Sequence, residues 1–295
     1  MNKKVVIALF TIFIALVISL KFIDGAKEPK GFVPKYAMGW AIKDEYSDFK
    51  ESDFKGEALE LPPFWPMALV INEEYLYAVD LMEGIQTLKI NPNGNLSSLY
   101  YLITIDKNQE SHIAYTENQD LAVKGSYLYV AETAYDRIRI LKINPDGSLT
   151  PKLTFGKEGK GLGEFSSAGG LAVKGDYLYI ADSGSNRIHV LKISPDGNLV
   201  PEYTFGKFGK ELGEFVSPSG LAIKEDYFYV VETANNRIHV LKINPDGSLT
   251  PKLTFGKQGK GLGEFSSLSG LAVKGNYLYV GDMGNKRIQV LEIKY

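Results

Sequence analysis

The chain has 295 residues, of which 44% are hydrophobic, so it has enough apolar material for the core of one large domain or two small ones. Thirty-three basic residues against thirty-five acidic ones give a formal net charge of −2, which argues against a nucleic-acid partner. The chain contains no cysteine, which excludes disulfides, thiol catalysis, zinc knuckles and iron–sulfur clusters.

Residues 1–23 predict an export segment. Lys3 and Lys4 precede a charge-free, apolar run from Val5 to Leu20. This run is shorter than the roughly 20 residues of a full membrane span, but Asp24 makes the following Gly25-Ala26 a poor cleavage site. We expect an uncleaved anchor that contacts the membrane through residues 5–23 and holds the domain outside the cytoplasm. Secretion after cleavage is the alternative.

Residues 24–35 are expected to be a linker, and a stretch rich in acidic and aromatic residues follows from Trp40 to Trp65. The stretch is predicted to connect a first short strand to the repeated part of the chain. As an insertion it could also dock a partner, because inserted loops often carry function.

From Leu69 onward a unit of about fifty residues repeats. Related strings such as LAVKGDYLYIADS begin at Leu121, Leu171, Leu221 and Leu271, and a degraded copy begins at Leu69. Residues 141–157 and 241–257 are identical, which indicates duplication. A period of this length changes the expected fold to a repeat architecture.

Each unit predicts four antiparallel strands. In the third unit they are residues 171–174, 177–181, 187–193 and 199–205, and a Ser-Pro-Asp-Gly turn joins the last two. Four such strands make one propeller blade. Apolar residues crowd both faces of the strands, as expected where a blade lies between two others in a ring.

The predicted fold is therefore all-β: a five-bladed β-propeller over residues 36–295, preceded by the N-terminal hydrophobic helix. The blades are expected near 69–105, 121–155, 171–205, 221–255 and 271–295. The last unit ends after its third strand, and the sequence Tyr36-Ala37-Met38-Gly39 matches the fourth-strand pattern Leu153-Thr154-Phe155-Gly156. Residues 36–40 are predicted to complete the last blade and close the ring.

The units resemble NHL repeats, whose pattern is approximated by Phe205-Gly206, Gly213-Glu214-Phe215 and residues 229–238; the third blade carries YIADSGSNRI. A weaker similarity links runs such as residues 244–251 to seven-bladed lactonase-type propellers. The NHL resemblance implies a propeller that usually has six blades. Enzymes of both kinds gather metal ligands or acid–base groups at the mouth of the central channel.

Comparison between the units distinguishes residues that recur in every blade, which indicates a structural role, from residues that depart from the repeat and could bind a ligand. His189 and His239 share a position with Arg139 and Gln289, and this exchange predicts an exposed polar side chain. Recurrent acids and arginines flank the loop between the second and third strands, as in Asp182 and Arg187, and predict an ion pair.

The glycine-rich connectors between blades, such as FGKEGKGLGEF, lack the phosphate-loop pattern. They place lysines around one face, where the ring could attract an anionic polymer or partner, although neighbouring glutamates dilute the charge. The candidate binding residues are Lys157, Lys160, Lys207, Lys210, Lys257 and Lys260.

One approach to a blade departs from the others. The sister blades have small residues and glycine before the repeated leucine, whereas the second blade has Thr116-Glu117-Asn118-Gln119-Asp120. His112 lies in the same segment. His112 and Glu117 are the candidate catalytic residues, and Glu117, Asn118 and Asp120 are candidate ligands for calcium or zinc. The competing interpretation is that this one blade has diverged in sequence without gaining a function. A metal site in the channel needs ligands from several blades.

The regular loops favour a non-enzymatic module, membrane-anchored or secreted, that binds a protein or glycan without a cofactor. The alternative is an extracytoplasmic lactonase or lyase with a metal site at the channel mouth. The sequence leaves open whether the chain is an enzyme, and it identifies neither the ligand nor the oligomeric state.

Overall fold

The computed structural model describes residues 66–80, 84–92, 96–102 and 120–293. The predicted export segment, the linker, the closing strand at residues 36–40 and the stretch from Trp40 to Trp65 lie outside these residues. Within the described part, no helix is both long and apolar enough to cross a membrane.

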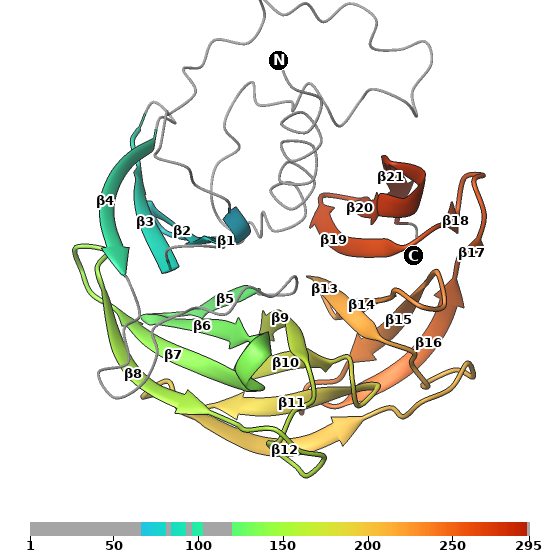
Figure 1. Cartoon of the computed structure of the whole chain (residues 1–295), viewed down its shortest axis with the longest axis horizontal. Coiled ribbons are helices and arrows are strands. Elements are labelled where there is room, and N and C mark those ends of the chain that lie inside the picture. The colour runs from blue at the N-terminus through green and yellow to red at the C-terminus, as the bar shows by residue number, and fades with distance from the viewer. Residues whose placement is uncertain (1–65, 81–83, 93–95, 103–119, 294–295) are drawn as a thin grey trace, which may run out of the picture.

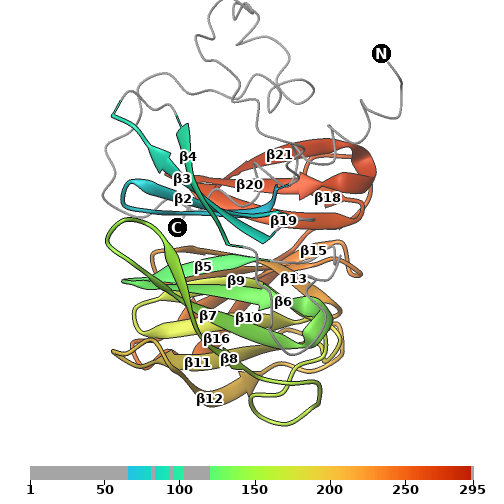
Figure 2. The same cartoon turned by 60° about the vertical axis from the view of Figure 1, so that its left-hand side comes forward.

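Five antiparallel sheets follow one another around a common centre (Figures 1 and 2). Each sheet is a meander in which consecutive strands pair, because two-residue turns and short loops join neighbouring strands. This arrangement confirms the predicted all-β, five-bladed propeller.

The first two blades differ mainly in their innermost strand. The first blade contains β1 (Pro66–Asn72), β2 (Tyr75–Asp80), β3 (Gly84–Ile90) and β4 (Leu96–Leu102). The second contains β5 (Leu121–Lys124), β6 (Tyr127–Glu132), β7 (Arg137–Ile143) and β8 (Leu149–Phe155). The inner strand β5 is thus shorter than its counterpart β1.

The remaining blades begin before the repeated leucine. The third contains β9 (Ala168–Lys174), β10 (Tyr177–Asp182), β11 (Arg187–Ile193) and β12 (Leu199–Phe205). The fourth contains β13 (Pro218–Lys224), β14 (Tyr227–Glu232), β15 (Arg237–Ile243) and β16 (Leu249–Phe255). The fifth has three described strands, β19 (Leu268–Lys274), β20 (Tyr277–Asp282) and β21 (Arg287–Glu292), after a short parallel pair, β17 (Lys257–Gln258) and β18 (Glu264–Phe265).

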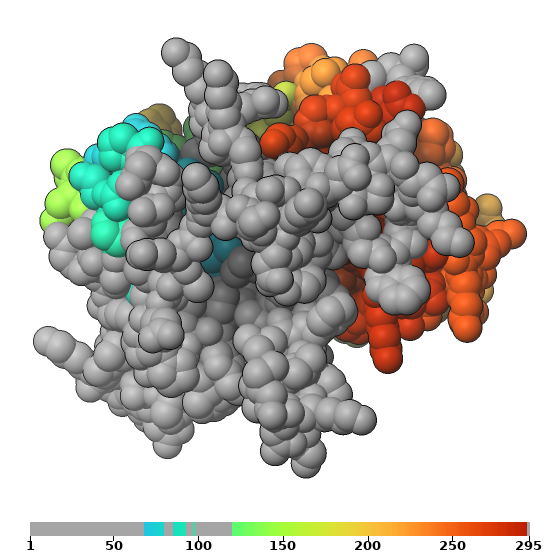
Figure 3. Space-filling model, turned by 90° about the horizontal axis from the view of Figure 1, so that it is seen from above, coloured from blue at the N-terminus to red at the C-terminus, as the bar shows by residue number. Residues whose placement is uncertain are grey.

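The first and last blades lie on opposite sides of the molecule when it is seen from above (Figure 3). The last blade has no fourth strand among the described residues. Ring closure by residues 36–40 therefore stays a prediction.

The inner strands of the third, fourth and fifth blades approach one another through their backbones. A Cβ atom added to Gly170 would lie 2.0 Å from the carbonyl oxygen of Ser219, and one added to Gly220 would lie 2.9 Å from the Cα of Gly270. Only glycine allows this approach. The glycine before the repeated leucine in these blades is thus a packing requirement at the centre of the ring.

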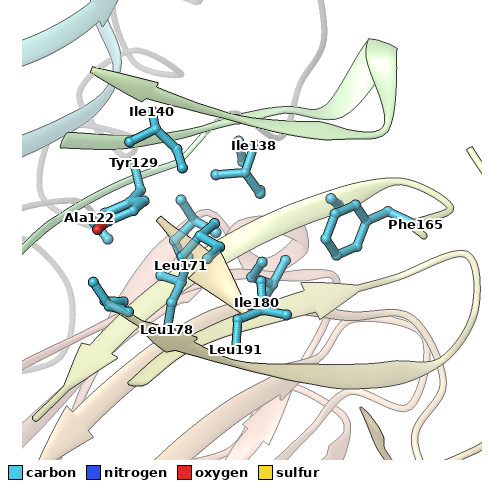
Figure 4. Close-up of a cluster of buried hydrophobic side chains, with 13 residues drawn as sticks. Ala122, Tyr129, Ile138, Ile140, Phe165, Leu171, Leu178, Ile180 and Leu191 are labelled. Carbon is cyan, nitrogen blue, oxygen red and sulfur yellow. The ribbon is translucent and has the colours of Figure 1, made fainter. Parts of the chain in front are cut away.

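Apolar side chains fill the space between neighbouring blades. Tyr129 and Ile138 from the second blade meet Leu171, Ile180 and Leu191 from the third, and all five side chains are buried (Figure 4). Equivalent clusters join the other consecutive blades, so the second, third and fourth blades bury both of their faces, which explains why their strands carry apolar residues on both sides.

Tyrosine side chains of one blade form hydrogen bonds with the Pro-Asp-Gly turn of the next blade. The hydroxyl group of Tyr129 donates a hydrogen bond to the carbonyl oxygen of Gly197 at 3.1 Å, and Tyr179 does the same to Gly247 at 3.0 Å. Gly197 has a φ of +80°, and a Cβ there would lie 2.4 Å from the ring of Tyr127. The Pro-Asp-Gly segments are therefore hairpin turns, as predicted, and they also lock neighbouring blades together.

Candidate functional site

One face of the ring, here called the connector face, carries two kinds of loop: those between the second and third strands of a blade, and the connectors between blades. Hydrogen bonds join the two kinds. Arg187 at the start of β11 donates from Nη1 to the carbonyl oxygen of Lys160 at 2.7 Å, and Asn285 donates to that of Gly259 at 2.8 Å. The sequence predicts that the candidate residues lie on this face, at the expected mouth of the central channel.

The connectors are rigid loops. In the first of the three, the amide of Gly159 donates to the carbonyl of Phe165, and the amide of Phe165 donates to the carbonyl of Lys157, both at 2.9 Å. The carboxylate of Glu164 accepts the amide of Gly161 at 2.9 Å. This amide, followed by the ammonium group of Lys157, holds the pKa of Glu164 below its ordinary value.

The six candidate lysines fall into two groups. Lys157, Lys207 and Lys257 lie 3.1 to 3.2 Å from the carboxylates of Glu164, Glu214 and Glu264. The other three are exposed and form no ion pair with another described residue: Lys160, Lys210 and Lys260. Only this second group offers an uncompensated positive charge.

The predicted ion pairs between the recurrent acids and arginines are confirmed. Asp182 is fully buried, and its carboxylate lies 3.1 Å from Nε of Arg187. The equivalent distances are 2.7 Å for Glu232 and Arg237 and 2.8 Å for Asp282 and Arg287. Each acid also accepts an amide from the connector, as Asp182 does from Ser166 at 2.8 Å. These groups hold the loops in place.

The prediction that His189 and His239 are exposed is wrong: both are fully buried. His239 lies with Nδ1 3.2 Å from the carboxylate of Glu232, and its Nε2 accepts the amide of Gly213 at 3.1 Å. Gln289 makes the same two contacts in the last blade, donating to Asp282 at 3.0 Å and accepting the amide of Gly263 at 2.9 Å. The exchange between His and Gln thus reflects a shared buried hydrogen-bonding role.

The charge states of this network follow from burial and hydrogen bonding. Burial alone would raise the pKa of Asp182, but hydrogen bonds from His189, the Ser166 amide and Arg187 outweigh it, so the pKa lies below its ordinary value. Burial lowers the pKa of His189, which favours the neutral ring. The ring stacks edge-on against Phe165 with 4.7 Å between centroids. The histidine contacts the blade's own groups, which is a structural role.

Asp120 stands where the sister blades have Gly170, Gly220 and Gly270. Its Oδ1 accepts the amide of Leu121 and its Oδ2 accepts the amide of Leu171, both at 2.8 Å. The carboxylate therefore joins the start of β5 to β9 in the next blade. Of the candidate residues in this segment, His112, Glu117 and Asn118 lie outside the described residues.

The described residues do not build a metal centre by themselves. No group of three His, Asp or Glu side chains within them could hold a metal ion. Asp120 is the one candidate ligand that is described, and an amide already donates to each of its oxygens. The described residues therefore give calcium or zinc no complete set of ligands.

Residues 65–295 match the family model described as "Lactonase, 7-bladed beta-propeller". No curated protein matches the chain. Among solved structures, it is similar to a functionally unknown protein from Desulfotomaculum acetoxidans, with a TM-score of 0.56, 14% identity, and coverage of 76% of this chain and 68% of that one.

Two further similar structures are described as lactonases. One is a putative 6-phosphogluconolactonase from Bacteroides fragilis, with a TM-score of 0.53, 18% identity, and coverage of 73% of this chain and 63% of that one. The other is a periplasmic gluconolactonase from Pseudomonas aeruginosa, with a TM-score of 0.54, 15% identity, and coverage of 77% and 66%. At these identities the likeness shows the fold alone, and this chain spans slightly less than two thirds of both proteins.

Proposed function

We propose, because this chain belongs to the lactonase family of seven-bladed β-propellers, that it hydrolyses a lactone at the entrance of its central channel on the connector face. The observation that carries the proposal is the family match, which extends over all the described residues. The match favours the weaker of the two sequence resemblances. The NHL resemblance stays a prediction.

Lactone hydrolysis needs few groups. Water adds to the ring carbonyl, the ring C–O bond breaks, and the ring oxygen leaves as a hydroxyl group, so the product is a hydroxy acid that releases a proton at neutral pH. A general base that takes the proton from water accelerates the addition. Glu117 and His112 are the proposed base and its partner, since they lie in the one connector that departs from its sisters.

Asp120 is proposed as the residue that positions this segment. Its carboxylate accepts the amides of Leu121 and Leu171 and so fixes the end of the segment against two blades. Both oxygens of this carboxylate already accept a hydrogen bond from the backbone. We therefore assign Asp120 to positioning the segment that carries Glu117, and not to taking the proton from water.

Binding of a protein or glycan without catalysis is the second candidate function. The specific observation in its favour is that the buried acids of the described connector face bond to the chain itself, as Asp182 does to Arg187 and Ser166. Location outside the cytoplasm, at the membrane or secreted, is part of both proposals. It is supported by the apolar run from Val5 to Leu20.

A kinetic comparison tests the choice between the two functions. The full chain in detergent is supplied with a panel of five- and six-membered sugar lactones, with and without phosphate, and ring opening is followed against buffer alone. Glu117→Gln is expected to lower kcat by about 10²-fold or more, as for loss of a general base. Glu158→Gln, in an exposed position on a sister connector, is the matched control and should leave kcat unchanged.

Two results would reject the proposal. Ring opening that never exceeds the buffer rate for any lactone would favour the binding function. Activity that survives both Glu117→Gln and His112→Asn would place the chemistry elsewhere in the chain. A divalent ion found in stoichiometric amount, and lost on Glu117→Gln, would revive the calcium or zinc hypothesis.

A further inference from the structure

Three connectors expose a leucine at the same position of the repeat. The exposed fractions are 53% for Leu162, 52% for Leu212 and 81% for Leu262, and Phe208 in the middle connector is 72% exposed. Large apolar side chains this exposed, recurring at one loop position in neighbouring blades, are typical of an interaction surface. We call these four residues the leucine rim.

The leucine rim cannot retract into the core, because the loops that carry it are fixed. In the middle connector, the amide of Gly209 donates to the carbonyl of Phe215 at 3.1 Å, and Arg237 donates to the carbonyl oxygens of Lys210 and Glu214. Phe215 is fully buried at the base of the loop. The connector thus buries one apolar side chain as an anchor and holds Leu212 in solvent.

Each leucine of the rim follows an uncompensated lysine by two residues: Lys160 precedes Leu162, and the other two connectors repeat this spacing. The first lysine of each connector is paired with a glutamate, as Lys157 is with Glu164. Glu158 and Glu211 are the remaining acids on the three connectors, against three unpaired lysines. The rim therefore combines apolar tips with a small positive excess.

We infer that the leucine rim contacts an anionic phospholipid surface, with the leucine and phenylalanine side chains at the acyl boundary and the lysines among the headgroups. Segments that lie at a membrane interface typically combine leucine and phenylalanine with lysine. The long lysine side chains reach the lipid headgroups while the neighbouring apolar side chains insert below them. This inference goes beyond the proposed hydrolysis and does not depend on it.

A membrane fits these observations better than a protein partner. The apolar tips come one or two to a connector, on three separate connectors, with charged residues between them. A stable protein interface buries about 800 Å² per partner in a continuous, well-packed patch. The same chain carries the apolar run from Val5 to Leu20, which the sequence predicts to lie in a membrane.

The absence of cysteine makes a site-specific test direct, because one introduced cysteine takes one label. The full chain is reconstituted in phosphatidylcholine vesicles with about a quarter phosphatidylglycerol, an anionic composition. It carries an environment-sensitive fluorophore at Leu212→Cys or, as the matched control, at Leu253→Cys. Leu253 lies on the outer strand β16 and is 50% exposed, so the two positions start from equal exposure.

The expected result is a blue-shifted emission and quenching by nitroxide lipids at position 212, and neither at position 253. Labels at Leu162→Cys and Leu262→Cys should behave like the label at position 212. Equal emission and quenching at positions 212 and 253 would overturn the inference, since the rim would then be no nearer the lipid than an outer strand.

A charge variant separates the lipid contact from mere proximity. Changing Lys160, Lys210 and Lys260 to glutamate is expected to reduce the quenching at position 212 several-fold on anionic vesicles, with an unchanged melting temperature. Full quenching in the variant would overturn the electrostatic part of the inference. Quenching that appears only when membrane proteins are added would overturn the whole of it in favour of a protein partner.

Discussion

Replacing His189 with glutamine is expected to remove a loss of stability between neutral and mildly acidic pH. His189 is fully buried beside Asp182 and Arg187, and burial lowers the pKa of its ring. Gln289 shows that glutamine fits the equivalent position, where it bonds to the recurrent acid and to a connector amide. His189 makes the first of these contacts, through Nε2 to Asp182 at 3.3 Å. The substitution therefore removes the titration with little change in packing.

The direction follows from proton linkage. In the unfolded chain a histidine binds its proton near pH 6.5, whereas the folded chain keeps His189 neutral to a lower pH. Below about pH 6.5 the unfolded state binds more protons, so stability falls as the pH falls, until the folded pKa is reached. The loss from about pH 7.5 to 5.5 is at most about 1.4 kcal/mol, which is the limit for a ring that stays neutral in the folded chain over this range.

The measurement is urea unfolding of the wild type and His189→Gln at several pH values above 5, where carboxyl groups with lowered pKa values stay ionised. The wild type should lose up to about 1.4 kcal/mol more than the variant across this range. His112→Asn is the control, because it removes another of the three imidazoles. A profile flattened by His112→Asn and unchanged by His189→Gln would refute the reasoning.

Three further substitutions, one of them with a matched control, test the packing of the ring by chemical unfolding. Gly170→Ala should lower the free energy of unfolding by about 2–3 kcal/mol because its Cβ would meet the Ser219 carbonyl. The control Gly175→Ala has open space around it and a φ of +58°, so it should lower this free energy by only about 1 kcal/mol. Equal losses would contradict the close approach of the inner strands. Tyr179→Phe should cost about 1 kcal/mol by removing the hydrogen bond to Gly247, and a neutral effect would count against the inter-blade lock. Asp120→Ala should cost about 1–3 kcal/mol because two amides lose their acceptor, and no loss of stability would show that the link between β5 and β9 is weak.

The fold was predictable because the repeated units of the chain can be aligned with one another. Strings repeated every fifty residues from Leu121 to Leu271 reveal the blade, and the Pro-Asp-Gly turns mark its hairpins. The inner strands were harder to delimit. β9, β13 and β19 begin three residues before the repeated leucine, at Ala168, Pro218 and Leu268. The glycine directly before that leucine is disfavoured in strands, but Gly170 and Gly220 allow the close approach at the centre of the ring.

The candidate site was less predictable, because the residue types found at equivalent positions of different blades do not reveal whether the position is buried. His189, Arg139 and Gln289 look like exposed residues in the sequence, yet they meet an acid from the neighbouring strand inside the blade. The signal that could have shown this was the recurrent acid itself, seven residues earlier, which needs buried partners. The leucines of the rim gave no signal in the sequence, since a leucine followed by a glycine is equally typical of a buried position.

Catalysis at the connector face is tested most directly by proton release from the full wild-type chain mixed with the lactone panel. Each ring that opens forms a hydroxy acid and releases one proton at neutral pH, so a pH-stat counts turnovers. The account predicts many protons per protein molecule with at least one lactone, and a rate that falls on Asp120→Ala because the link from Asp120 to β9 is lost. Proton release that matches buffer alone for every lactone would contradict it.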